Sequence, residues 1–463
     1  SLLCTGLIFL GIRGRLEKKS PIRVGTAYFS DHPFLNQLGL TPVFTLLRSG
    51  LDMLDEDNST VALMSNRKAI QNVRNYLGIK RPLGDFPIAR QVVADSSGEK
   101  KYNVILVIME GMSAAKMTRH GNPQQFTPFL DSIAQKGYSF DNIYTAGIHT
   151  FNGIFSTLFS LPAIYRQNPM KESTIFRYNG IGNTLRRKGY STSYFTTHDG
   201  QFDNVEGFLR ANDFENVITV ADYPSEKVRG PLGVPDDYMF EFAMPHLDRV
   251  HRSNKPFFAA FMTASDHRPF YMPDYFQPKS KETREQIVEY ADWSLRKLVT
   301  LASEKKWFAN TLFVFVADHG SPMYAVYDIP LAYHHTPLIF YAPGIIKDYR
   351  SFEKIGGQID VFPTIMGVLN QSYINNTLGV NLLKESRPYI FINHDEMTGV
   401  LNNDFFLILK KGGETSLYRY VTNDKKDYQT EQPKLVADMK EYAFSNLQVF
   451  QYLMQTKSRF IDK

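Results

Sequence analysis

Two uninterrupted apolar runs constrain the fold of this chain more than any other feature of its sequence. The runs are Asn103-Val-Ile-Leu-Val-Ile-Met-Glu110 and Thr311-Leu-Phe-Val-Phe-Val-Ala317, and both are apolar at every position after the first until the run ends. A strand that is apolar on both faces must be covered on both faces, which is typical of a parallel sheet between two layers of helices. We therefore expect an α/β domain built around such a sheet.

The middle of the chain continues this pattern. Further segments expected to be strands lie at 191–197, 256–264 and 337–341. Helical patterns alternate with them at 127–137, 181–188 and 282–304. Strands that alternate with helices predict a mostly parallel central sheet with helices on both faces. We assign residues 101–372 to this domain and expect it to be catalytic.

The pattern changes after Ser372. Short strands are expected at 389–393, 404–410 and 416–421, followed by a helix that begins at Pro433. Closely spaced short strands with no helices between them favour antiparallel pairing. We therefore predict that residues 373–463 form a small C-terminal antiparallel α+β subdomain.

The first residues form a separate apolar run. Residues 1–12 are mostly apolar and are followed by the basic stretch Arg13-Gly-Arg-Leu-Glu-Lys-Lys19. A bilayer span needs about 20 apolar residues, so the run is either a buried core segment or the remnant of a transmembrane helix. We take it as the remnant and expect residues 13–100 to be a helical juxtamembrane linker. The basic flank favours a cytoplasmic exit, contrary to the location inferred below.

Composition excludes several classes of protein. The chain has 463 residues, a formal charge of +5 and no dominant Lys/Arg block, so a nucleic-acid partner has little electrostatic support. Cys4 is the single cysteine, which excludes an intramolecular disulfide framework and a cysteine-rich zinc site.

Acidic and histidine side chains follow most of the apolar strands. They are Glu110, His198-Asp199, Asp266-His267-Arg268 and Asp318-His319, while His334-His335 precede the segment 337–341. Each alone has an ordinary interpretation as a helix cap, a turn or a satisfied histidine. Because ligands bind at the carboxyl edge of a doubly wound sheet, their coincidence favours a site for a divalent ion such as Mn²⁺ or Zn²⁺.

A hydroxyl-rich loop at 144–162 offers a nucleophile, and Thr150 stands where an apolar helix is expected to begin. A hydroxyl at a helix N-terminus lies in a positive potential that stabilises an alkoxide, and the free backbone N–H groups there bind phosphate oxygens. A plain helix cap is the alternative interpretation of Thr150.

These motifs together resemble the alkaline phosphatase/sulfatase superfamily. The resemblance covers about residues 101–372 and rests on four ordered motifs. They are Asn103–Glu110 with the helix at 127–137, the hydroxyl loop, Asp318-His319-Gly320 and Gln358-Ile-Asp-Val-Phe-Pro-Thr364. Within the superfamily the chain is most similar to the lipoteichoic acid synthase and phosphoglycerol transferase branch.

The resemblance implies roles for individual residues. It implies that one divalent ion, Mn²⁺ first and Zn²⁺ or Mg²⁺ as alternatives, is bound by Glu110, Thr150, Asp318 and His319. It implies a substrate pocket lined by His198, His267, Arg268 and His335. The number of histidines, with His394 among them, leaves a second ion open. The nucleophile loop lacks the Cys/Ser-x-Pro/Ala-x-Arg motif of formylglycine sulfatases, which argues against that class.

Two departures leave the transferred group open. Lipoteichoic acid synthases carry a Phe-Trp-Asn-Arg stretch that contacts glycerol phosphate, whereas this chain has Phe202-Asp203-Asn204. Their nucleophile loop reads Gly-Lys-Thr-Ser, and here it is Ile148-His149-Thr150-Phe151. A phosphoethanolamine transferase is the main alternative, with Asp199, Asp203 or Glu396 as the contact for the ammonium. A superfamily phosphodiesterase and an inactive polymer-binding module are further alternatives.

The expected reaction is a two-step transfer of a phosphoglycerol-type group through a phosphothreonine on Thr150. His267 or His335 would protonate the leaving oxygen. The expected partners are a membrane phospholipid donor and an envelope glycan or polyol-phosphate acceptor. We expect a monomer on the bacterial cell membrane, with its catalytic domain outside the cytoplasm.

Overall fold

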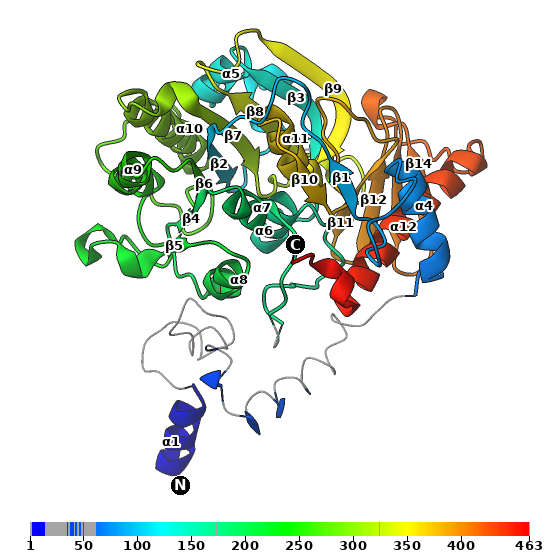
Figure 1. Ribbon diagram of the computed structural model, residues 1–463, viewed down its shortest axis with the longest axis horizontal. Coiled ribbons are helices and arrows are strands. Elements are labelled where there is room, and N and C mark those ends of the chain that lie inside the picture. The colour runs from blue at the N-terminus through cyan, green and yellow to red at the C-terminus, as the bar shows by residue number, and fades with distance from the viewer. Residues whose placement is uncertain are drawn as a thin grey trace.

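An eight-stranded sheet forms the centre of the molecule (Figure 1). The computed structural model describes residues 2–13, isolated positions between 35 and 50, and residues 62–462 except 173, 174 and 324. Along the sheet the strands are β5 (Asn216–Ile218), β4 (Ser191–Thr196), β6 (Phe257–Met262), β2 (Asn103–Met109), β7 (Thr311–Ala317), β8 (His335–Tyr341), β3 (Tyr138–Tyr144) and β9 (Arg350–Gly357).

The predicted mostly parallel sheet is confirmed, with one exception in its direction. The strands from β5 to β7 run parallel to one another, and β3 runs parallel to β9. β8 is antiparallel to both of its neighbours, β7 and β3. Because β8 runs the other way, its first residue lies at the same edge as the last residues of β7 and β3.

Alternate side chains of the central strands enter two separate cores. Val104, Leu106 and Ile108 of β2 belong to one buried cluster, while Ile105 and Val107 belong to another. Helices on the first face are α6 (Thr150–Phe159), α7 (Ile181–Arg187), α8 (Val205–Ala211) and α11 (Val361–Val368). Helices on the second face are α5 (Pro128–Ala134), α9 (Asp236–Arg252) and α10 (Thr283–Ser303). The apolar runs form strands because both of their faces are covered.

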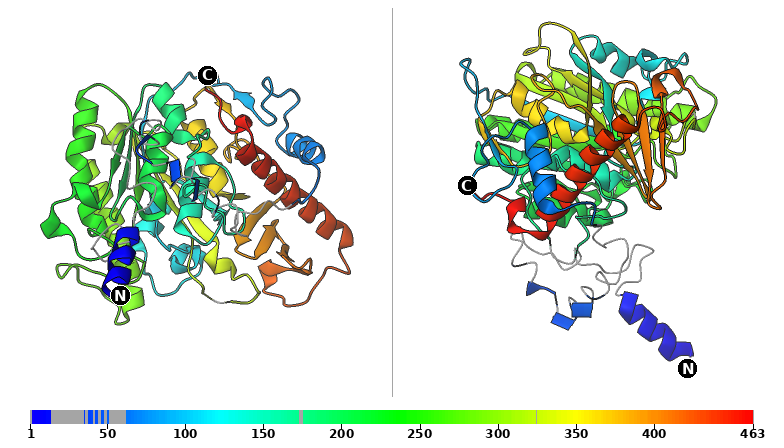
Figure 2. Two further views of the ribbon diagram at one scale, coloured as in Figure 1. Left: turned by 90° about the horizontal axis from the view of Figure 1, so that it is seen from below. Right: turned by 90° about the vertical axis from the view of Figure 1, so that its right-hand side faces the viewer.

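A small antiparallel sheet and a long helix follow the central domain. The sheet consists of β11 (Ile390–His394), β12 (Met397–Leu401), β13 (Phe406–Lys410) and β14 (Thr415–Tyr418). Helix α12 (Pro433–Gln455) lies beside it, on the opposite side of the molecule from α9 (Figures 1 and 2). Leu407 and Leu447 share a buried cluster with Val104 of the central sheet, so the C-terminal region and the domain share one core.

From residue 62 onward, the segment expected to be a helical linker packs against the C-terminal region. Helix α4 (Asn66–Tyr76) buries Ala69 and Val73 and packs against α12. Strand β1 (Arg90–Val92) pairs antiparallel with β10 (Tyr373–Asn375). Most of residues 14–61 lie outside the described residues. Helix α1 (Leu2–Arg13) is described, and no helix in the described ranges combines the length and apolar character needed to cross a bilayer.

A buried ion pair joins the central domain to the C-terminal region. The Arg387 guanidinium contacts the Asp360 carboxylate, and their side chains are only 3% and 0% exposed. Arg387 also donates to the Tyr442 hydroxyl of α12 at 2.9 Å. Removing one partner from a buried pair leaves an uncompensated buried charge, which is strongly destabilising.

We therefore expect Arg387→Met to lower the free energy of unfolding by about 3 kcal/mol. Lys384→Met is the matched control, because the Lys384 and Asp95 side chains are 60% and 52% exposed and such pairs contribute at most about 1 kcal/mol. Urea denaturation of both variants measures the difference. Equal losses of stability in the two variants would contradict the role of the buried pair.

Candidate active site and metal centre

Four neighbouring parallel strands end at one edge of the central sheet. In the order β4, β6, β2 and β7, they are followed by His198, Asp266, Glu110 and Asp318, respectively. A cavity of about 1040 Å³ opens at this edge, and Glu110, Asp266 and His319 line it. The strand order thus places side chains from distant parts of the sequence around one space, as expected for the carboxyl edge of such a sheet.

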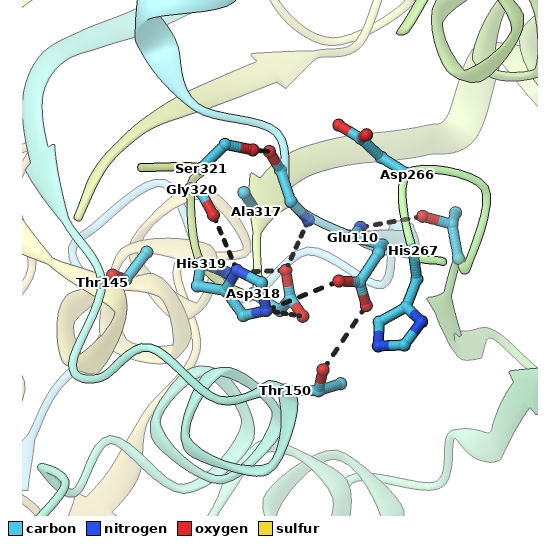
Figure 3. Close-up of polar contacts among 12 residues, drawn as sticks. Glu110, Thr145, Thr150, Asp266, His267, Ala317, Asp318, His319, Gly320 and Ser321 are labelled. Atoms are coloured by element: carbon cyan, nitrogen blue, oxygen red, sulfur yellow. Dashed lines mark hydrogen bonds and ion pairs between the residues drawn. The ribbon is translucent and has the colours of Figure 1, made fainter. Parts of the chain in front are cut away.

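Glu110, Asp318 and His319 converge at the floor of this cavity (Figure 3). Their ligand atoms all lie within 4.8 Å of one another. His319 Nε2 is 3.5 Å from Glu110 Oε1 and 3.4 Å from Asp318 Oδ2. His319 Nδ1 donates to the Gly320 carbonyl at 2.8 Å, so Nε2 carries the free lone pair that a metal ion requires.

The electrostatics of this cluster call for a cation. Burial raises the pKa of Glu110 well above its usual range, and the negative charges of Asp318 and Asp266 raise it further. Asp318 is fully buried, and among the described residues its Oδ2 atom has no hydrogen-bond partner. An unpaired buried carboxylate oxygen is costly. Two carboxylates and one imidazole form a suitable ligand set for a divalent ion such as Mn²⁺ or Zn²⁺, so the residues fit the implied metal.

Thr150 lies beside the cluster at the start of α6. Its hydroxyl donates to Glu110 Oε2 at 3.4 Å (Figure 3). As the first residue of the helix, Thr150 lies at the positive end of the helix dipole. Gly153 permits this approach, because a Cβ at Gly153 would be 2.5 Å from Asp318 Cα. The structure therefore brings the predicted nucleophile to the candidate metal ligands.

The motif that begins at Gln358 holds the nucleophile loop against the end of β7. Gln358 Nε2 donates to the Ala317 and Asp318 carbonyls, both at 2.7 Å. Its Oε1 accepts from the Ala146 N–H at 2.8 Å. The sequence motif marked this segment, but only the structure shows that its glutamine connects the loop before Thr150 to the end of β7, which carries two of the candidate metal ligands.

Of the four residues predicted to line the substrate pocket, two line the cavity. His267 and Arg268 line the cavity. His267 Nδ1 donates to the Arg268 carbonyl at 2.6 Å, which leaves Nε2 to exchange a proton. His198 is not among the residues that line the cavity. Its ring contacts that of Phe202, a lining residue, with centroids 5.6 Å apart, and its Nδ1 atom is hydrogen-bonded to Thr196 Oγ1 at 2.8 Å.

The prediction that His335 lines the substrate pocket is not supported by its position. Its ring is stacked on Tyr144 at 5.3 Å between centroids, and Nε2 donates to the Asp141 carbonyl at 2.7 Å. Burial lowers its pKa. His335 stands at the correct edge of the sheet, but its side chain is directed into the packing around β3. The position of a residue at the end of a strand determines at which edge of the sheet it lies, but it does not determine where its side chain points.

Several cationic side chains that the sequence analysis did not single out also line the cavity. They are Lys116, Lys171 and Arg284. The Lys171 ammonium contacts the Asp203 carboxylate. Lys116 and Arg284 do not directly follow a strand, and Lys171 lies in the segment after α6. Position relative to the predicted strands therefore gave no signal for these residues.

Comparison with known proteins agrees with this fold. The sulfatase family model matches residues 102–371, and the chain belongs to the sulfatase family. Among curated proteins, it is 23% identical over 352 residues to the lipoteichoic acid synthase-like protein YvgJ of Bacillus subtilis. The aligned region covers 70% of this chain and 53% of that protein. The predicted superfamily is confirmed, and the chain spans about half the length of the curated relatives it matches.

Two solved structures share the fold. An alkaline phosphatase superfamily protein from Vibrio parahaemolyticus superposes with a TM-score of 0.77 at 22% identity, covering 88% of this chain and 99% of the other. The lipoteichoic acid synthase LtaP from Listeria monocytogenes gives a TM-score of 0.65 at 18% identity, covering 84% and 98%. Both likenesses cover most of this chain, so its overall fold is shared with these two proteins.

We expect Mn²⁺ to raise the melting temperature of the wild-type protein and to have little effect on Asp318→Asn. At a hundredfold excess over the dissociation constant, bound metal adds about 2.7 kcal/mol of stability. In EDTA the variant should be as stable as the wild type or more stable, because one of two neighbouring buried carboxylates loses its charge. Thermal denaturation with and without Mn²⁺ measures both effects.

Asp404→Asn is the control, since Asp404 is an exposed carboxylate in the C-terminal region. It should respond to Mn²⁺ as the wild type does. An Asp318→Asn protein that keeps the full Mn²⁺ response would rule out Asp318 as a ligand.

Proposed function

We propose that this chain transfers a phosphoglycerol-type group from a membrane phospholipid to an envelope glycan or polyol-phosphate polymer. The observation that carries the proposal is the contact of the Thr150 hydroxyl with Glu110 at the floor of a cavity lined by cations. A nucleophile beside a metal cluster and among positive charges is suited to a phosphodiester anion. Relatives named as lipoteichoic acid synthases support the same chemistry.

We propose one divalent ion, Mn²⁺, on Glu110, Asp318, His319 and Thr150. When bound, such an ion supplies Lewis-acid stabilisation of negative charge and lowers the pKa of an adjacent hydroxyl. In the described residues, Glu110, Asp318 and His319 are the one group of three or more acidic, histidine or cysteine side chains with converging ligand atoms. This supports a single-metal transferase over a two-metal phosphodiesterase.

The chain's own groups account for both steps of the transfer. In the first step Thr150 Oγ bonds to phosphorus, the bond from phosphorus to the lipid oxygen breaks, and that oxygen takes a proton from His267 Nε2. The Thr150 proton passes to Glu110 Oε2, which already accepts its hydrogen bond. In the second step an acceptor hydroxyl attacks phosphorus and gives its proton to His267, while Thr150 departs and regains its proton from Glu110.

The three carboxylates considered as partners for an ammonium group favour glycerol phosphate over ethanolamine phosphate. Of the three side chains considered as partners for an ammonium, Asp203 lines the cavity, and it is already paired with Lys171. Glu396 pairs with Lys411 at 3.0 Å. Asp199 accepts from the Gln201 N–H at 3.0 Å in a local turn. A cationic head group bound by Asp203 would have to displace Lys171.

The proposed substrates imply a location. A phospholipid donor is reached at a bilayer surface, and envelope acceptors lie outside the cytoplasm. We therefore propose a monomer held at the bacterial cell membrane with its catalytic domain on the outer side.

Intact-mass spectrometry tests the covalent intermediate. After incubation with Mn²⁺ and phosphatidylglycerol we expect a glycerol phosphate adduct on the wild type, and none with phosphatidylethanolamine. Thr150→Ala should give no adduct, whereas Thr150→Ser keeps the hydroxyl and should retain it. Absence of an adduct with either lipid in a metal-loaded protein would refute the lipid-donor transferase. An ethanolamine phosphate adduct would reassign the head group.

A pair of histidine variants tests the assignment of the acid–base group. His267→Gln should lower turnover of phosphatidylglycerol by about 10² to 10⁴, the usual contribution of a positioned acid–base group. His335→Gln should leave the rate per folded molecule near the wild-type value and lower the melting temperature, because its ring is buried against β3. A large loss of turnover in His335→Gln with little loss in His267→Gln would assign the acid–base role to His335 instead.

A further inference from the structure

Lys116 places a buried ammonium beside the candidate metal cluster. Its side chain is 7% exposed, and its Nζ atom donates to the Gly111 carbonyl at 2.7 Å and to Ser321 Oγ at 2.8 Å. Nζ also contacts Asp266 Oδ2. Burying an ammonium is costly unless it is paired and fully hydrogen-bonded. Three oxygen acceptors, one of them charged, meet this requirement.

The three oxygens come from three different strand ends. Gly111 follows β2, Asp266 follows β6 and Ser321 follows β7. Gly111 has a φ of 62°, and a Cβ there would be 3.4 Å from Asp266 Oδ2, so the backbone at this position suits glycine. In Figure 3, Asp266 and Ser321 lie on the side of the cluster away from Thr150. An oxygen cage on a single centre is the environment that hard cations select.

Gly111 connects this cage directly to the candidate metal ligands. Its N–H donates to Asp318 Oδ1 at 2.9 Å, while its carbonyl accepts from Lys116. The charge of Asp266 is also close enough to raise the pKa of Glu110. Three carboxylates, Glu110, Asp318 and Asp266, thus share one region with a single ammonium. When all three carboxylates are ionised, their charges and that of the ammonium sum to −2, which one divalent cation balances.

We propose that the Lys116 ammonium permanently fills a second cation position and so limits the site to one divalent ion. Removing the side chain would open a second divalent site formed by Asp266, Ser321 and the Gly111 carbonyl. Hydrolases of phosphate esters commonly use two metal ions, so Lys116 would separate a one-metal transferase from that arrangement. This inference rests on the metal centre of the proposed function.

Metal stoichiometry tests the proposal without any measurement of activity. The wild type and Lys116→Ala are dialysed to equilibrium against Mn²⁺, and bound metal per chain is determined by elemental analysis. We expect one ion in the wild type and two in Lys116→Ala, with a return to one in Lys116→Ala/Asp266→Asn. Lys136→Ala removes the same charge from an exposed lysine and should bind one ion.

Each outcome supports or overturns the inference. Two ions in the wild type, or one ion in a folded Lys116→Ala, would overturn it. If Lys116→Ala unfolds without metal because Asp266 is left unpaired, Mn²⁺ should restore its melting temperature, and failure to do so would also overturn the proposal. If the wild type binds one ion and forms the Thr150 adduct, but Lys116→Ala also binds one ion, the role of Lys116 is refuted and the proposed function is not. A wild type that binds no Mn²⁺ would remove it together with the proposed metal-dependent function.

Discussion

The approach of two buried carboxylates, Glu110 and Asp318, is the interaction on which the rest of the site depends. Burial and mutual repulsion make this pair unfavourable in the protein alone, and both carboxylates follow strands that are fully buried. The fold maintains the pair because β2 and β7 are hydrogen-bonded neighbours along their whole length. A bound cation would compensate this repulsion. Thr150 and His319 contact Glu110, and Lys116 contacts the neighbouring Gly111.

Much of this arrangement could be predicted because it is encoded locally. The apolar runs in β2 and β7 are long enough to be recognised as doubly covered strands, and the polar residue after each run is then placed by the rules of parallel sheets. The same reasoning located Asp266 and His267 after β6. It also placed a hydroxyl at the start of α6, which the structure confirms as the first residue of that helix.

Other features depend on contacts that no local pattern reveals. Strands β3 and β9 mix polar and apolar residues; β3 pairs with β8 and with β9, which lies at the edge of the sheet. Strand β12 was not predicted, since its short segment contains Thr398 and Gly399. His335 was assigned to the pocket from its strand-end position, whereas its side-chain direction is set by packing against Tyr144. No local pattern marks Lys116, because the three oxygens around its ammonium come from three segments that are distant in the sequence.

The contact between Gly153 and Asp318 has a consequence for how such a site diversifies. With a hydrogen as the only side chain at Gly153, the helix that carries Thr150 rests directly on the backbone of a metal-ligand strand. The start of α6 and the end of β7 are therefore in direct contact, with no room for a methyl group between them. The rim of the cavity is different, because the residues Lys171 and Arg268 are themselves exposed. Residues at this rim can therefore change without disturbing the contact between α6 and β7.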